Sequence, residues 1–387
     1  MEQCWEPYAE ELVNTKNADE IITILHRISN IYGVLEGTPC CVVVGRDTRP
    51  HSEDLAKCII SGAKSYGAIV HDMGLVSTPQ LHFIVQKANE NTQSFPILSL
   101  DREEAIANYH DTLGAGYLDL LRSSGEALTS ESIVVDGSYG IGAISVVNQI
   151  HSLNKVVPDI LVLDIRNGAF EGPVNDGCGA EFVQKGQVPP KGVDSERDID
   201  KAMCSFDGDA DRIVFHSYLS KDNKWTLLDG DKIAALFSLF LSQEFNESGL
   251  YKDFTLGVVQ TAYANGASTI FLRSRGIKVI MAKTGVKFLH HKAHEFDMGI
   301  YFEANGHGTV LFSKKLMDKL NSWTLESSLL NRERSNMAMT RLKVSDYIVL
   351  IHALFLTNIF EKYFYRPILC QTMMLRRRLP SFNIVHK

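Results

Sequence analysis

The stretch Phe206-Asp207-Gly208-Asp209-Ala210-Asp211-Arg212 places three carboxylates at alternate positions, separated only by a glycine and an alanine. On a flat strand Asp207 and Asp211 would lie roughly 13 Å apart at ~3.3 Å per residue, too far apart for one cation to contact both. The backbone must therefore curl, and small spacers allow a tight curl. Apolar residues follow at 213–215, so we expect this segment to be a loop that joins two strands.

Three hard oxygen ligands on a short turn are typical of a Mg²⁺ site. Crowding of the three carboxylates should also raise their pKa values when no metal is bound. An EF-hand is excluded, because its sixth position would be Arg212 instead of Gly and its twelfth would be Tyr218 instead of Glu. An acidic solvated turn is the other alternative, but it leaves the arginine and the small spacers unexplained. The sequence predicts Mg²⁺ as cofactor, with the ligands Asp207, Asp209 and Asp211.

The composition is that of a folded globular chain. Its 387 residues, 45% apolar and 22% charged, are enough for two or three domains. The net charge of −7 argues against a nucleic-acid partner. Seven cysteines without Cys-x-x-Cys spacing indicate reduced thiols. The longest apolar run, 347–355, is too short to span a bilayer, and the first residues do not resemble a signal peptide. We therefore expect a cytoplasmic protein with no membrane partner.

A strand followed by a small or polar turn and an amphipathic helical pattern recurs three times, with strands near 42–45, 133–135 and 257–259. Alternating strands and helices predict an α/β fold with parallel or mixed sheets. Ligands in such folds bind beyond the carboxyl ends of the strands, where these turns lie. Thr78-Pro79 predicts a further helix start, with Thr78 as the cap and Pro79 at the first helical position.

Two further segments could contact a ligand. Residues 302–309 place an acid, an amide and an imidazole on a glycine-bearing loop, which suits sugar hydroxyls, although a plain polar loop has the same composition. Lys283 lies in a basic run that could face a phosphate or form one solvated helix face. Arg46 and Arg49 flank Asp47 on a strand-to-helix turn, where they could contact a phosphate or pair with that aspartate. The motifs of serine hydrolases, P-loop NTPases and dinucleotide-binding dehydrogenases are missing from the sequence.

Taken together, the motifs occur in one order across roughly the first 313 residues. They are Gly45 to Arg49, Thr78 to His82, Asn175 to Ala180, Ser205 to Val214, Leu228 to Ile233, Val259 to Gly266, Lys283 to Lys287 and Phe302 to Thr309. This order of motifs resembles that of the phosphoacetylglucosamine mutases, which belong to the α-D-phosphohexomutase superfamily. The loop Glu303-Ala304-Asn305-Gly306-His307 resembles the N-acetylglucosamine branch, since glucose and mannose mutases carry different residues there.

The resemblance implies an intramolecular phosphotransferase that interconverts N-acetylglucosamine 6-phosphate and 1-phosphate for UDP-N-acetylglucosamine synthesis. A phosphoserine donates its phosphate to the sugar phosphate, and Mg²⁺ offsets the charge. The resemblance assigns sugar contacts to Glu303, Ala304, Asn305 and His307, and contacts with the phosphate or phosphoserine to Arg212, Arg46 and Lys283. The alternatives are a glucose or mannose phosphomutase and a non-catalytic protein that binds Mg²⁺ or sugar phosphate.

In this family a Ser-His-Asn-Pro loop carries the phosphoserine, and a C-terminal Arg-Pro-Ser-Gly-Thr loop clamps the substrate phosphate. Neither occurs in the 387 residues. We therefore assign no catalytic residue, and we expect an incomplete first domain, a missing fourth domain and a monomer that is inactive alone. The expected divisions are a remnant of domain I at 1–95, domain II at 96–216, domain III at 217–358, shortened after 313, and a divergent tail at 359–387.

Overall fold

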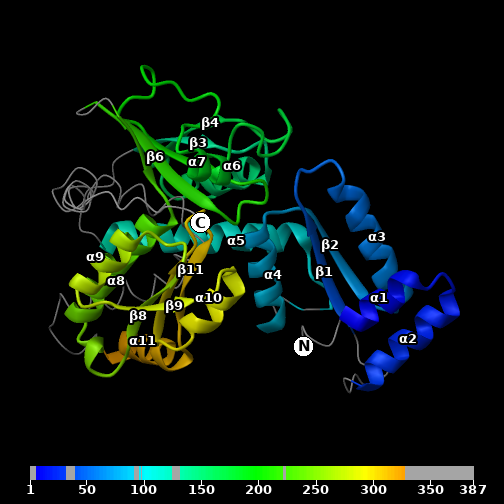
Figure 1. Cartoon of the computed structure of the whole chain (residues 1–387). Helices are drawn as coiled ribbons and strands as arrows, with labels where there is room; N and C mark the ends of the chain where they lie inside the picture. The colour runs from blue at the N-terminus through cyan, green and yellow to red at the C-terminus, as the bar shows by residue number, and fades with distance from the viewer. Residues whose placement is uncertain are drawn as a thin grey trace, which may run out of the picture.

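The computed structural model describes residues 6–31, 40–90, 96, 98–123, 131–220 and 224–326. Within these ranges the strands form three separate sheets, each built from its own stretch of chain. Figure 1 shows the sheets arranged around one long helix, α5 (Arg102–Ser123), which crosses between them. The prediction of an α/β fold with parallel and mixed sheets is confirmed. Among the described helices, none has the length and apolar character needed to cross a membrane.

The first unit contains one βαβ motif with helices on either side of it in sequence. Its two strands are parallel and pair from Cys41 with Ile69 to Arg46 with Leu75. The turn after β1 carries Thr48 and Arg49, at the carboxyl end of the strand, where ligands bind in such motifs. The elements are α1 (Glu6–Asn14), α2 (Ala18–Ile31), β1 (Cys41–Arg46), α3 (Ser52–Ser65), β2 (Ile69–Leu75) and α4 (Thr78–Glu90).

The second unit is a mixed five-stranded sheet with the order β4-β3-β5-β6-β7. Strand β3 is parallel to β4 and β5, whereas β6 is antiparallel to both β5 and β7. Residues 207–212, which we call the Asp loop, join β5 to β6, as the sequence predicted. The elements are β3 (Glu131–Asp136), α6 (Ile141–Asn154), β4 (Leu161–Arg166), α7 (Ala180–Gly186), β5 (Ala202–Phe206), β6 (Ile213–Leu219) and β7 (Lys224–Leu228).

The expected domain boundary at residue 216 falls inside β6. His216 pairs with Met203 on one side and with Leu227 on the other, so the sheet is continuous across that position. Strand β7 adds a further edge to the same sheet. We therefore place the end of this unit after Leu228, because a boundary within a paired strand would break the hydrogen-bond ladder.

The third unit is a four-stranded sheet with the order β11-β10-β8-β9. Strand β8 is parallel to β9 and β10, and β10 forms an antiparallel hairpin with β11. That hairpin carries the loop 303–307 at its tip. The elements are α8 (Gly230–Glu247), η2 (Leu250–Lys252), β8 (Leu256–Thr261), α9 (Gly266–Ser274), β9 (Lys278–Ala282), α10 (Val286–Ala293), β10 (Met298–Phe302), β11 (Gly308–Phe312) and α11 (Lys314–Glu326).

The described part of the third unit extends beyond residue 313 to the end of α11. Helix α11 buries Leu316 and Leu320 in the main apolar core. Its start is fixed by Ser313, whose hydroxyl donates to Asp297 and accepts from the backbone nitrogen of Leu316. Residues 327–387, which include the expected tail at 359–387, lie outside the described residues.

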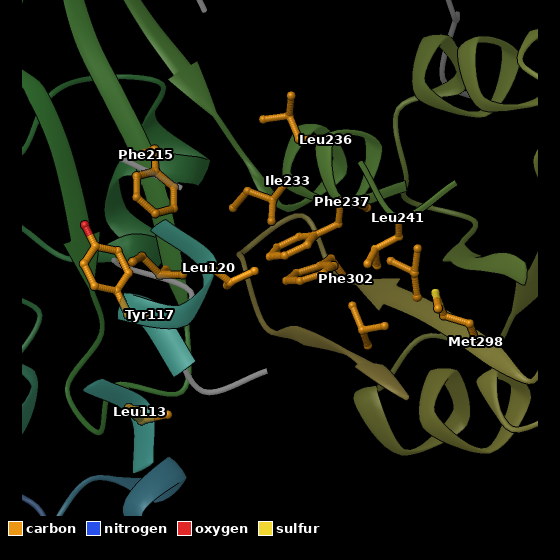
Figure 2. Packing of buried hydrophobic residues seen from close by; sticks show 14 of the residues in the cluster. Leu113, Tyr117, Leu120, Phe215, Ile233, Leu236, Phe237, Leu241, Met298 and Phe302 are labelled. Atoms are coloured by element: carbon orange, nitrogen blue, oxygen red, sulfur yellow. The ribbon is translucent and has the colours of Figure 1, made fainter. Parts of the chain in front are cut away.

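The second and third units share one apolar core, and α5 lies within it. Figure 2 shows Leu120 of α5 lying between Phe215 of β6 on one side and Ile233 and Phe237 of α8 on the other. The rings of Phe237 and Phe302 stack with centroids 5.6 Å apart. Each such buried side chain contributes about 1.5–3 kcal/mol through removal of apolar surface from water. This shared core fixes β6 relative to β10, and thus the Asp loop relative to the loop 303–307.

Candidate active site

The Asp loop curls as the sequence predicted. One oxygen from each of Asp207, Asp209 and Asp211 lies within 4.8 Å of the other two, and no other such group of three occurs in the described residues. The curl results from Ala210, whose φ of 59° lies in the left-handed region. Asp207 stabilises the turn, since its carbonyl accepts from the Ala210 nitrogen at 3.2 Å and its Oδ1 accepts from the Arg212 nitrogen at 3.2 Å.

Gly208 is needed for space and not for backbone curvature. A Cβ atom at this position would lie 2.4 Å from Cγ1 of Val174 and 3.2 Å from Nη2 of Arg49. Its carbonyl accepts a 3.1 Å hydrogen bond from the backbone nitrogen of Ile141, the first residue of α6. The Asp loop is therefore enclosed by the second unit on one side and approached by the first unit on the other.

The pKa values of Asp207 and Asp211 are shifted in opposite directions. Burial, together with the negative charges of Asp211 and Asp209, raises the pKa of Asp207 to about 8. Burial also acts to raise the pKa of Asp211, but the hydrogen bond and charge of His307 outweigh it and lower that pKa overall. The expectation that crowding raises these pKa values therefore holds for Asp207 and is wrong for Asp211.

The donor set fits a hard divalent cation. Three carboxylates converge on one point, and Oδ1 of Asp211 is buried without a hydrogen-bond partner in the part of the chain that the structure describes. Nε of Arg212 lies 3.6 Å from this oxygen, beyond hydrogen-bond distance, so the oxygen still lacks a donor among the described residues, and a metal cation that contacts it would offset the cost of burying it. Oxygen ligands in a short loop suit Mg²⁺, which retains other positions for water or phosphate.

Helix α4 of the first unit contacts the loop directly. The backbone nitrogen of Thr78 donates to the carbonyl of Asp209 at 3.0 Å, and the hydroxyl of Thr78 donates to Oδ2 of Asp209 at 2.7 Å. Thr78 was expected to cap α4, and that expectation is wrong. The cap is Ser77, whose hydroxyl accepts from the Gln80 nitrogen at 3.3 Å while the Gln80 side chain accepts from the Ser77 nitrogen at 2.8 Å. The Thr78 hydroxyl is thereby available to the Asp loop.

A pocket of about 460 Å³ opens beside the Asp loop. Three cationic side chains line it beside three carboxylates, so a phosphate could pair with the cations where a metal ion neutralises the carboxylates. Within the pocket wall, Nη1 of Arg212 donates to Oε2 of Glu181 at 2.8 Å, and its Nε lies 3.7 Å from Asp207 and 3.6 Å from Asp211. The lining residues are Arg49, Asn175, Glu181, Phe182, Lys185, Gly186, Asp207, Asp209 and Arg212.

Of the three predicted phosphate contacts, the structure brings only Arg212 to this pocket. Nη2 of Arg46 lies 3.4 Å from the Glu53 carboxylate on α3. Lys283 is exposed, and its Nζ lies 6.0 Å from the centre of the Phe288 ring. Arg49 lines the pocket in their place. It forms an ion pair with Asp47, which was one of the two alternatives that the sequence left open for this turn. Its Nη2 lies 3.9 Å from Oδ1 of Asp209.

The loop 303–307 forms a tight turn at the tip of the β10–β11 hairpin. The Glu303 nitrogen donates to the His307 carbonyl at 2.7 Å, and the Gly306 nitrogen donates to the Glu303 carbonyl at 2.9 Å. Oδ1 of Asn305 accepts from the His307 nitrogen at 3.0 Å. The carbonyl of Ala304 accepts from the nitrogen of Gly230 at 3.0 Å, which ties the turn to the start of α8. Glu303, Ala304, Asn305 and His307 are all half-buried, as expected for side chains at the edge of a binding site.

This turn lies directly against the Asp loop. Nδ1 of His307 is 3.2 Å from Oδ2 of Asp211. Gly306 adopts a φ of 88°, and a Cβ there would lie 1.8 Å from the carbonyl oxygen of Ile213 in β6. The structure therefore joins the predicted metal ligands and the predicted sugar contacts in one site.

Glu181 and Lys185 also line this site, although no sequence motif predicted them. They lie one turn apart on α7, directly after the segment 175–180 that contributed to the resemblance. Their i,i+4 spacing was the available signal, because oppositely charged residues at that spacing share one helix face.

The family comparisons agree with this geometry. A family model described as phosphoacetylglucosamine mutase AMG1, domain III, matches residues 229–352, and its domain II counterpart matches residues 117–214. The chain belongs to the phosphoacetylglucosamine mutase family. A model for the α/β/α domain I of phosphoglucomutases and phosphomannomutases matches residues 12–94. The domain III match beyond residue 313 agrees with the packing of α11.

Phosphoacetylglucosamine mutases from several organisms are similar to the chain. The pig protein is 42% identical over 324 residues, which cover 83% of this chain and 57% of the pig protein. The human protein is 40% identical over 320 residues, which cover 82% of this chain and 56% of the human protein. The chain therefore spans little more than half the length of these relatives.

Solved structures of family members share the fold. The Aspergillus fumigatus N-acetylphosphoglucosamine mutase in complex with GlcNAc-6P and magnesium has a TM-score of 0.73 and 30% identity, covering 88% of this chain and 64% of that one. An N-acetylglucosamine-phosphate mutase in its substrate complex has a TM-score of 0.76 and 31% identity, covering 89% of this chain and 62% of that one.

Proposed function

We propose that this chain carries the metal-binding and sugar-binding parts of a phosphoacetylglucosamine mutase, which interconverts N-acetylglucosamine 6-phosphate and 1-phosphate. The observation that carries this proposal is the contact between His307 and Asp211 at 3.2 Å. It places side chains that suit sugar hydroxyls beside a carboxylate cluster that suits Mg²⁺. A sugar phosphate needs both kinds of group within its own length.

Each part of the site has a distinct role in this proposal. Asp207, Asp209 and Asp211 would hold Mg²⁺, which when bound offsets negative charge on a phosphate. Arg49 and Arg212 line the adjacent pocket and would orient the phosphate through charge-assisted hydrogen bonds. The carboxylate of Glu303 and the amide of Asn305 would accept from and donate to sugar hydroxyls.

Transfer of phosphate also requires a group that donates it. The resemblance implies that a phosphoserine in a Ser-His-Asn-Pro loop does so in this family, and the 387 residues contain no such sequence. We therefore propose that these residues by themselves bind Mg²⁺ and sugar phosphate without turning the substrate over. A mutase of this type would act in the cytoplasm and supply the precursor of UDP-N-acetylglucosamine.

Two alternatives make different predictions. A glucose or mannose mutase is disfavoured, because the matching models for domains II and III are those of phosphoacetylglucosamine mutases. A purely binding role shares the same site, and it predicts no turnover even when a phosphorylated serine loop is supplied.

Calorimetric titration of the purified chain with a panel of sugar phosphates in Mg²⁺ tests the proposal. We expect N-acetylglucosamine 6-phosphate to bind at least about tenfold more tightly than glucose or mannose 6-phosphate, a difference of about 1.4 kcal/mol. The matched variant is Glu303→Gln, which keeps an oxygen to accept from the Gly285 nitrogen but removes the charge. It should weaken sugar-phosphate binding and leave Mg²⁺ binding unchanged. Equal affinity for all three sugars would contradict the proposal.

A further inference from the structure

A buried chain of hydrogen bonds links three helices behind the Asp loop. At its centre is His110 of α5, which is 4% exposed. Nε2 of His110 lies 3.1 Å from Nε2 of Gln80 on α4, and Nδ1 lies 3.0 Å from Oε1 of Gln149 on α6. The amide of Gln149 donates back to the His110 carbonyl at 2.9 Å. Both glutamines are buried as well.

The direction of every bond in this chain is determined by its neighbours. Oε1 of Gln80 already accepts from the Ser77 nitrogen at 2.8 Å, so the amide nitrogen of Gln80 faces His110 and donates. Nε2 of His110 must therefore accept, which places the ring proton on Nδ1. Nδ1 then donates to Oε1 of Gln149, and the Gln149 amide nitrogen remains for the His110 carbonyl. A neutral His110 with its proton on Nδ1 therefore accepts from Gln80 and donates to Gln149. An amide side chain would not place an acceptor and a donor at the same two positions.

The two helices that His110 joins are also the two that hold the backbone of the Asp loop. Helix α4 begins with Thr78, whose nitrogen and hydroxyl both donate to Asp209. Helix α6 begins with Ile141, whose nitrogen donates to the carbonyl of Gly208. Adjacent residues of the loop are thus bound by the first residues of two different helices, which come from the first and second units. Their separation must be fixed if the loop is to keep its curl.

We propose that His110 is a positioning residue for the Asp loop. It sets the spacing of α4 and α6 through Gln80 and Gln149, and the N-terminal residues of these helices hold Asp209 and Gly208 in the conformation that gathers the carboxylates. The part of this inference that concerns Mg²⁺ rests on the proposed function. The part that concerns the hydrogen bonds of Thr78 and Ile141 does not.

The first test measures Mg²⁺ affinity by calorimetry on the full 387-residue chain, at a temperature where unfolding curves show every variant to be folded. His110→Phe removes both side-chain hydrogen bonds and keeps a planar ring. We expect it to weaken Mg²⁺ binding about tenfold, the lower end of the range for residues that orient ligands from outside the first coordination shell. Gln80→Met, which preserves side-chain length, should have a similar effect. Because both act through one link, the double variant should lose no more than either single variant.

The matched control is Ser238→Ala. Ser238 is equally buried, and its hydroxyl donates to the Ala234 carbonyl within α8, away from the Asp loop. It should leave Mg²⁺ affinity unchanged even if it lowers stability. Wild-type affinity in a folded His110→Phe variant, or an equal loss in the Ser238 control, would overturn the inference.

Amide hydrogen exchange provides the second readout, and it needs no metal. In His110→Phe and in Gln80→Met the amides of Thr78 and Ile141 should exchange faster, while the amide of Asn265, the N-cap of α9 in the third unit, should not. If the wild-type chain binds no Mg²⁺, the proposed metal site is wrong, and this exchange pattern still decides the positioning role. Unchanged protection of Thr78 in both variants would show that His110 does not position the loop.

Discussion

Nδ1 of His307 lies 3.2 Å from Oδ2 of Asp211, and this contact connects a hairpin tip of the third sheet to the Asp loop of the second. The two loops come from strands that share one apolar core, so the contact is held from behind by the packing of β6 and β10. A sugar held by the hairpin tip and a phosphate held beside the Asp loop would therefore keep a fixed relative position. Preorganisation of this kind lowers the entropy cost of binding.

Close packing of the hairpin tip depends on Gly306. Gly306→Ala should destabilise the protein by about 3 kcal/mol or more, because it adds a strained φ to a direct clash with the Ile213 carbonyl. Sugar-phosphate binding should fall as well, since the clash displaces Glu303 and Asn305. The control is Gly276→Ala, which has a similar φ of 76° but nothing within 4 Å of the new Cβ. It should cost only about 1–2 kcal/mol. If Gly306→Ala and Gly276→Ala shift the denaturation midpoint by the same amount, the predicted clash is contradicted.

The hydroxyl of Thr78 should affect the metal site more than the stability of α4. Thr78→Val keeps the shape but removes the 2.7 Å hydrogen bond to Asp209. We expect Mg²⁺ affinity to fall several-fold, in line with about 0.5–1.5 kcal/mol for one hydrogen bond. Thr78→Ser restores the hydroxyl and should restore most of the affinity. A Val variant with unchanged Mg²⁺ affinity would show that this hydrogen bond does not orient the ligand.

The buried His216 predicts a specific pH dependence of stability. Burial lowers its pKa from 6.5 to about 3 in the folded protein. Its stabilising contribution is therefore complete above the unfolded pKa of 6.5 and is lost as the pH falls from there toward about 3, because the unfolded chain takes up a proton that the folded chain does not. Between these two pKa values, the free energy of unfolding can fall by about 1.4 kcal/mol for each unit by which the pH is lowered.

Urea denaturation at about pH 7 and about pH 5 measures this effect. His216→Gln keeps a polar side chain near the Ser205 hydroxyl, which now lies 3.0 Å from the His216 ring, but it cannot titrate. The variant should lose less stability between the two pH values than the wild type does. His151→Gln is the control, since His151 is exposed in the folded protein. If His216→Gln retains the full wild-type slope, another group is responsible.

Catalysis by the isolated chain provides a further prediction. With N-acetylglucosamine 6-phosphate and Mg²⁺, the purified 387 residues should form no 1-phosphate above the background, because they contain no Ser-His-Asn-Pro sequence to donate the phosphate. A coupled assay or phosphorus NMR measures this directly. Turnover that persists after repurification and disappears in Asp209→Asn would show that the chain has its own phosphate donor.

Local sequence patterns predicted a large part of this site. The alternating carboxylates with small spacers correctly indicated a curled loop between two strands, because the steric constraints on such a turn are local. The same is true of the strand-turn-helix repeats. The sequence did not predict the separate roles of the two spacers. Ala210 adopts the left-handed conformation, whereas Gly208 provides room for Val174 and Arg49.

The contacts that join the units could not be predicted in this way. Thr78 and Asp209 are 131 residues apart, and nothing periodic connects them. The dipeptide Thr78-Pro79 by itself predicts a cap at Thr78, whereas Ser77 and Gln80 form the capping-box pattern that assigns this role to Ser77. Arg46 and Arg49 could not be distinguished from sequence, because which of them reaches the pocket depends on how the first unit packs against the second.

A calorimetric Mg²⁺ titration of Asp209→Asn shows whether Asp207, Asp209 and Asp211 form the metal site. This variant keeps an oxygen to accept from Thr78 and removes one anionic ligand. Asp119→Asn, which makes the same charge change on an exposed face of α5, is the control. We predict that wild type and Asp119→Asn bind Mg²⁺ equally and that Asp209→Asn binds it at least about tenfold more weakly. Identical heats for all three proteins would show that the loop is not the metal site.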